Sequence, residues 1–175
     1  MDFRDHLVFS EKQIAQAEVH SSSIIDISLY LIPSILLSWM AIEAFINSVI
    51  DDLNQVPDGL FSLHERAFLL EKRVIFCEKG KQFGKFMIDK TSEYRRLEDK
   101  IFFLIAKFSK MDDDFKGKKL WQEFERFKED RNYIVHPRRS SEFKLDIEKA
   151  RHYLSLSKDI ISLISKHVWK KRIEF

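Results

Sequence analysis

Residues 119–137 carry the stretch KLWQEFERFKEDRNYIVHP, whose apolar spacing predicts one helix that ends at a proline. At about 100° per residue, one stripe of this helix collects the apolar residues Leu120, Phe124, Phe127, Ile134 and Val135. Arg131 lies in phase with that stripe, where a core residue is expected. Because an unpaired buried charge is costly, Arg131 must pair with an acid, lie beside a partner subunit or point into an anion-binding cleft.

The end of this helix brings polar groups together. Asn132 and His136 are four residues apart, so they share the face next to the apolar stripe. Pro137 cannot continue a helix normally and biases His136 away from helical backbone angles. We therefore expect the imidazole of His136 at a helix end, where the backbone can open towards a substrate.

The run of Arg131, Asn132, three apolar or aromatic residues and His136 resembles the Arg-polar-x-x-x-His signature of HEPN domains. These all-helical domains occur in many RNA-cutting toxins and defence proteins. The aromatic residues before the motif and Pro137 after it suit the resemblance. So does the stretch SWMAIEAFIN at 38–47, which looks like an early core helix of some HEPN families.

The resemblance implies a metal-independent endoribonuclease that needs no cofactor. In that chemistry the ribose 2′-OH attacks the adjacent phosphorus, and the products carry a 2′,3′-cyclic phosphate and a 5′-OH. His136 would exchange protons as general base or acid. Arg131 would hold the scissile phosphate, and Asn132 would orient the imidazole or bond a phosphate oxygen.

One histidine per chain does not comfortably serve as both acid and base. HEPN nucleases bring two copies of the motif together, so the resemblance implies a homodimer with the motif helices near its two-fold axis. Arg138 and Arg139 would line the approach and hold the RNA backbone. An antitoxin or other partner protein would fit a toxin or defence role. Some HEPN toxins carry a modified tyrosine two places after the histidine, and Arg138 stands there instead.

A second hypothesis stays open beside the nuclease. Many HEPN-like domains only bind RNA or nucleotides or mediate assembly, and one intact motif does not establish catalytic geometry. The other histidines, His6, His20, His64, His152 and His167, are scattered without the spacing of a metal hydrolase. We therefore expect no metal site.

Composition favours one helical domain. A chain of 175 residues fits a single domain over 1–175, and its 45% of hydrophobic residues allow a sizeable core. Only four glycines and three prolines interrupt abundant helix-forming residues. We expect an all-α, HEPN-like, up-and-down bundle of about five to six helices.

Charge is distributed unevenly along the chain. Residues 1–60 have a net charge of −7, and the remaining residues, which include the motif, have +9. This basic excess suits a phosphate-bearing partner such as RNA. Cys77 is the only cysteine, which excludes an intrachain disulfide and a cysteine zinc site. The start of the chain lacks the features of a signal peptide, so we expect a cytoplasmic protein.

The apolar segment at 24–50 is expected to form the central core helix. Only 16 residues separate Asp26 from Glu43, which is short of the roughly 20 apolar residues of a membrane span. Glu43 and Asn47 lie on successive turns of one face of this helix. They meet water at the edge of the buried face, or Glu43 pairs with Arg131 and orients it. The sequence leaves both alternatives open.

The other segments follow from local signals. Ser62 and Glu65 predict a capping box for a helix that extends through Val74 and Cys77 to Gly80, with Cys77 buried on its apolar face. Residues 80–91 are expected to form a mobile basic connection. Further helices are predicted over 92–109 and 146–171, and a solvated turn over 111–117.

Overall fold

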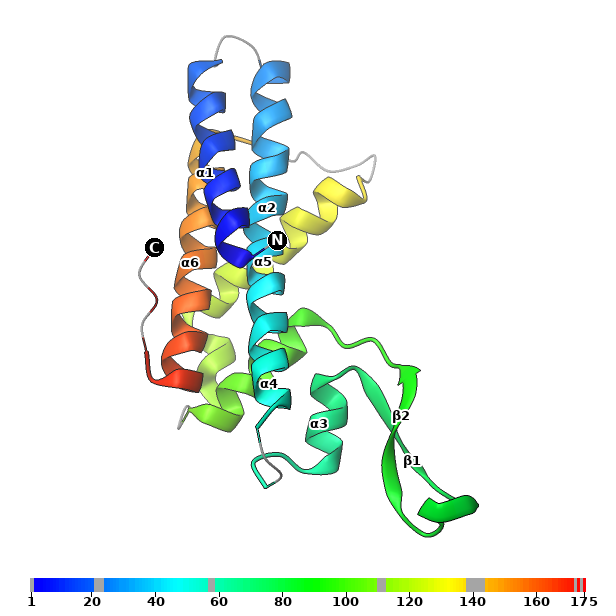
Figure 1. Ribbon diagram of the computed structural model, residues 1–175. Helices are drawn as coiled ribbons and strands as arrows, with labels where there is room; N and C mark the ends of the chain where they lie inside the picture. The colour runs from blue at the N-terminus through cyan, green and yellow to red at the C-terminus, as the bar shows by residue number, and fades with distance from the viewer. Residues whose placement is uncertain are drawn as a thin grey trace. The chain divides into compact units, whose positions relative to one another are not determined.

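The computed structural model describes residues 2–20, 24–56, 59–109, 113–137, 144–171, 173 and 175. Over these residues the order of elements is α1 Phe3–Val19, α2 Ile24–Asn54, α3 Leu63–Leu69, β1 Lys72–Phe76, η1 Gly80–Gln82, β2 Phe86–Ser92, α4 Leu97–Phe108, η2 Asp113–Gly117, α5 Lys119–Val135 and α6 Ile147–Trp169. The fold is mostly helical, as predicted. A β-hairpin, which the sequence analysis did not predict, joins the six helices (Figure 1).

The described contacts divide the chain into two compact units. The first comprises Met1–Phe45 and Leu104–Phe175, and the second comprises Ile46–Phe103. The boundaries fall inside α2 and α4. The single domain over 1–175 stays a prediction.

In the first unit, α1, α2 and α6 run side by side as a helical bundle (Figure 1). Buried serines let these helices approach closely. The Ser10 hydroxyl of α1 donates to the Ser34 carbonyl oxygen of α2 over 3.0 Å. The hydroxyl oxygens of Ser10 and Ser38 are 2.9 Å apart. The Ser157 hydroxyl of α6 donates to the Ser38 carbonyl over 2.9 Å. These bonds satisfy polar groups that burial would otherwise leave costly.

Helix α2 fills the centre of this bundle, where it buries Leu31, Ile35 and Ile42. It runs through Pro33 as one helix. By length and composition, its part Ile27–Asn54 also meets the requirements of a membrane span, and half of its most apolar window is buried inside the protein. The burial agrees with the predicted core helix.

The second unit corrects two predictions around Cys77. The predicted helix ends at Leu69, and Glu71 takes a left-handed backbone with φ of 53°. The capping box of Ser62 and Glu65 is present as predicted. Beyond Glu71 the chain forms β1, so Val74 lies in a strand. Cys77 is only half-buried and does not lie on an apolar helix face.

The predicted basic connection at 80–91 contains β2, which pairs antiparallel with β1. The register joins Val74 with Ile88, Ile75 with Met87 and Phe76 with Phe86. The backbone N–H groups of Cys77 and Gly84 donate to the carbonyls of Lys85 and Cys77, each over 2.9 Å, and close the hairpin. The helix predicted over 92–109 begins only at Leu97, because β2 continues to Ser92.

The bounds of α5 and α6 agree closely with those predicted from the sequence. Helix α5 begins at Lys119 and ends at Val135, and α6 begins after Asp146, whose carboxylate accepts the Lys149 N–H over 2.7 Å. The predicted turn at 111–117 contains η2. Residues 111 and 112 of this turn lie outside the described residues.

Candidate active site at the end of α5

Aromatic packing holds α5 against α2 and α6 within the first unit. The ring of Trp39 on α2 stacks on Phe124 at 5.3 Å between centroids and meets Phe127 edge-on at 5.3 Å. Phe127 stacks in turn on Tyr153 of α6 at 4.3 Å. All four side chains are buried. Such aromatic contacts restrict how far α5 can slide or rotate, so they fix the position of the motif at its end.

Arg131 extends this aromatic row with a charge. Its guanidinium carbon lies over the Trp39 ring, 5.8 Å from the centroid. Its Nη1 donates to the Asn132 side-chain oxygen over 3.1 Å. Its Nε is buried and is one of three buried side-chain polar atoms without a hydrogen-bond partner in the described residues. The half-buried guanidinium therefore keeps a buried N–H donor that no described residue accepts.

The ion pair between Glu43 and Arg131, one of the two alternatives left open by the sequence, is not formed among the described residues. Glu43 is half-buried, and its carboxylate accepts the indole N–H of Trp39 over 2.8 Å. Among the described residues, neither Glu43 nor Arg131 forms an ion pair. Trp39 connects them instead, with its N–H on the carboxylate and its ring face beneath the guanidinium. Glu43 thus orients the indole that carries Arg131.

The predicted alternative of a water-exposed edge holds for Asn47, one turn further along α2. Its side chain is exposed. Asn47 belongs to the second unit.

Asp130 explains why Arg131 is not neutralised by its own neighbour. The Asp130 carboxylate accepts the Tyr153 hydroxyl and pairs with the Lys149 ammonium at 3.0 Å. Burial and this carboxylate raise the pKa of Tyr153 above its usual range, so the phenol stays protonated as a donor. Two residues of α6 therefore engage the acid closest to Arg131 in sequence.

His136 caps the C-terminal end of α5, as predicted. Its backbone has φ of −129° and ψ of 68°, and its N–H donates to the Asn132 carbonyl over 2.8 Å. The side chains of Asn132 and His136 are both exposed. No described side chain bonds the imidazole of His136. The Asn132 amide oxygen already accepts from Arg131, which leaves its N–H donors available to an anion.

The structure thus brings Arg131 and Asn132 into contact and leaves His136 exposed one turn further along α5. Arg138 and Arg139 lie outside the described residues. The roles of Trp39 and Asp130 were not predicted from the sequence. A signal for Trp39 was present, because it precedes Glu43 by four residues on one helix. The partners of Asp130 lie 19 and 23 residues further along the chain, so no local pattern indicates them.

The described residues contain no group of three or more histidine, cysteine or acidic side chains placed to hold a metal ion. One cavity of about 400 Å³ lies along α5 and α6. It is lined by Glu123, Arg126, Asp146, Glu148, Lys149, His152 and Tyr153. This lining mixes both signs of charge and includes none of the motif residues.

A scan against protein-family models and searches of curated proteins and of solved structures each found no match to this chain. The HEPN resemblance therefore rests on the motif and its setting alone.

Proposed function

We propose that this protein is a metal-independent endoribonuclease of the HEPN type that acts as a homodimer. The observation that carries the proposal is the state of Arg131. Its half-buried guanidinium lies over Trp39, keeps a buried Nε without a described partner and meets no described carboxylate. A buried donor without a partner costs about 1–3 kcal/mol, so such a group is retained where a ligand satisfies it.

A phosphodiester suits these donors. Arginine presents a planar fork of N–H groups that matches two phosphate oxygens, and Asn132 adds amide N–H donors beside it. The charge on the phosphoryl oxygens grows when the 2′-oxygen attacks. Donors already held in place by the aromatic row stabilise that charge without rearranging.

His136 supplies the proton transfers in this proposal. One imidazole takes the proton of the 2′-OH as the oxygen bonds to phosphorus. A second gives a proton to the departing 5′-oxygen as the P–O bond breaks. Each chain has one histidine in the motif, so the second imidazole comes from the other protomer of the homodimer.

An exposed apolar side chain near the motif supports the dimer. Val135, at the end of α5 and next to His136 in the chain, is 41% exposed. Such a residue beside polar groups is typical of protein interfaces. A two-fold contact there would bring two motif helices together.

Cleavage of labelled RNA in EDTA tests the chemistry. We expect products with a 2′,3′-cyclic phosphate and a 5′-OH, and a loss of about 10²–10⁴-fold in rate with His136→Ala. Arg126→Met, an exposed arginine on the same helix, is the matched control and should cleave normally. RNA binding without cleavage in the wild-type protein would support the non-catalytic alternative. Cleavage that His136→Ala leaves intact would exclude this site.

A second experiment tests the dimer. In sedimentation equilibrium we expect Val135→Asp to dissociate the dimer and to lower cleavage, with activity recovering at high protein concentration. Val19→Asp, an exposed valine at the end of α1, should change neither. Full activity of a monomeric Val135→Asp protein would contradict the composite site.

A further inference from the structure

The hairpin of β1 and β2 combines positive charge with exposed aromatic rings. Between Lys72 and Ser92 the chain has six basic and two acidic residues, a net charge of +4. Figure 1 shows the two strands as a twisted ribbon joined by the turn that contains η1. The charge on this ribbon exceeds the net charge of +2 on the whole chain, so it is a local feature.

Three phenylalanines of the hairpin are exposed to solvent. Phe76 and Phe86 are cross-strand partners, with ring centroids 5.3 Å apart. They are 50% and 62% exposed, and Phe83 in the connecting turn is 69% exposed. Exposed rings of this size contribute little to a core, so their place on the ribbon indicates a binding role.

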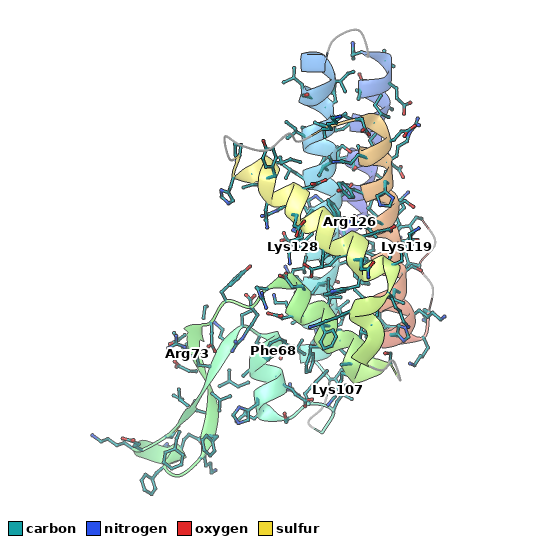
Figure 2. All side chains as sticks on the ribbon, turned by 180° about the vertical axis from the view of Figure 1, so that it is seen from behind. Phe68, Arg73, Lys107, Lys119, Arg126 and Lys128 are labelled. Atoms are coloured by element: carbon teal, nitrogen blue, oxygen red, sulfur yellow. The ribbon has the colours of Figure 1, made fainter. Side chains whose placement is uncertain are left out.

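Three lysines close to these rings in the chain have no described ion-pair partner. Lys79, Lys81 and Lys85 are exposed in the segment between the strands, and none forms an ion pair with a described residue. Arg73 is exposed on β1, as labelled in Figure 2. Lys72 is not available in the same way, because its ammonium donates to the Lys90 carbonyl over 2.9 Å.

The two acids of the hairpin, Glu78 and Asp89, leave its net charge at +4. Asp89 accepts the Thr91 hydroxyl and the Lys90 N–H, and these bonds hold the pKa of its carboxyl below the usual range. Arg73 interacts with it electrostatically. The lysines of the turn keep their charges, so a polyanion is the complementary ligand.

We infer that the β1–β2 hairpin binds single-stranded RNA, with bases stacked on Phe76 and Phe86 and phosphates held by Lys79, Lys81 and Lys85. Single strands offer unstacked bases to aromatic rings, whereas a double helix hides their faces. The inference rests on the proposed function for the choice of RNA as the nucleic acid.

Charge placement favours RNA over two other partners. A second copy of the hairpin would bring two ribbons of +4 together, which repel each other. A membrane-inserting turn would concentrate its positive charge beside the rings of Phe76, Phe83 and Phe86, which lie at the turn end of the hairpin. Arg73 and Lys90 instead extend the charge along the strands, away from the turn.

Fluorescence anisotropy with a labelled 12-nucleotide single-stranded RNA tests the inference. The full chain carries His136→Ala throughout, so a failure to bind is distinguished from a failure to cleave. We expect Phe76→Ala and Phe86→Ala each to raise the Kd by about 5- to 100-fold. Phe9→Ala removes an exposed ring from α1 and should leave the Kd unchanged.

Salt dependence separates the phosphate contacts from stacking. Replacing Lys79, Lys81 and Lys85 together by glutamine should flatten the slope of log Kd against log salt by about 2, at roughly 0.7 per phosphate contact of a single strand. Lys119→Gln, an exposed lysine of α5, should leave the slope unchanged. An unchanged slope in the triple variant would overturn the inference.

Phe86→Trp keeps a ring at the same position and provides a signal that does not depend on loss of binding. Its fluorescence should be quenched when RNA stacks on it. Three results would overturn the inference: binding unaffected by both alanine variants, binding of phosphatidylserine vesicles but not RNA, or self-association abolished by Phe76→Ala. Intact RNA binding without cleavage by the wild-type protein would overturn only the proposed function.

Discussion

Replacing Arg131 with methionine separates its role in folding from its role in function. Methionine keeps the unbranched apolar stem and fills the space over Trp39, and only the guanidinium is lost. If the charge is held there for a phosphate, its removal should hardly affect the free energy of unfolding while it removes catalysis.

The structure shows which contacts of Arg131 stabilise the fold and which of its groups costs free energy. The contact with Trp39 at 5.8 Å contributes about 0.5–2 kcal/mol, and the bond to Asn132 about 0.5–1.5 kcal/mol. Against them, the buried Nε without a partner costs about 1–3 kcal/mol. These ranges nearly cancel, so we expect the free energy of unfolding to change by no more than about 1 kcal/mol.

Urea unfolding followed by circular dichroism measures that change, and RNA cleavage in EDTA measures the function. We expect Arg131→Met to lower the cleavage rate by about 10²–10³-fold, which is typical for a lost donor to a developing oxyanion. Inorganic phosphate should raise the Tm of the wild-type protein but not of Arg131→Met. A loss of more than about 3 kcal/mol in stability with normal cleavage would refute the reasoning, because Arg131 would then be a structural residue.

Three further changes test the serine contacts of the first unit, the buried phenol of Tyr153 and the cap of α3. Ser38→Val overfills the contact between α1 and α2 and removes one hydrogen-bond partner of the Ser10 hydroxyl, so the free energy of unfolding measured in urea should fall by about 1–3 kcal/mol. The exposed control Ser155→Val should change this free energy little. Equal effects of the two variants would contradict this packing. Because the pKa of Tyr153 is raised in the folded protein, its protonated phenol contributes full stability below about pH 10. This stability is lost as the pH rises further, because the phenol of the unfolded chain ionises first. Tyr153→Phe should therefore flatten the alkaline fall in stability, and no difference from the wild-type protein would argue against the buried phenol. Ser62→Ala removes the cap of α3 and should lower the protection of its amides in hydrogen exchange by about 1 kcal/mol, and unchanged protection would mean that the cap contributes nothing.

The success of the sequence analysis at α5 has a local cause. Apolar spacing, the charge of Arg131 and the proline at 137 all act within a few turns of one helix, so they predict its bounds and place His136 at its end. The capping box at Ser62 is equally local, because both of its hydrogen bonds lie within four residues.

The errors have a physical cause as well. Val74 and Cys77 continue a helical spacing from Leu70, so the pattern alone extends α3 too far. The strand that replaces the helix exists because it pairs with residues 86–92, further along the chain. Strand pairing depends on such distant partners, and short apolar runs suit helix and strand alike.

The sequence by itself determined that the chain is mostly helical, where α5 ends and which residues gather at that end, because hydrophobic periodicity and helix stop signals act over neighbouring turns. Tertiary structure decided what Arg131 meets. It placed Trp39 beneath the guanidinium, turned Glu43 towards the indole and committed Asp130 to Tyr153 and Lys149. Those contacts join α2, α5 and α6, and only the packing of distant segments can bring such groups within hydrogen-bonding distance.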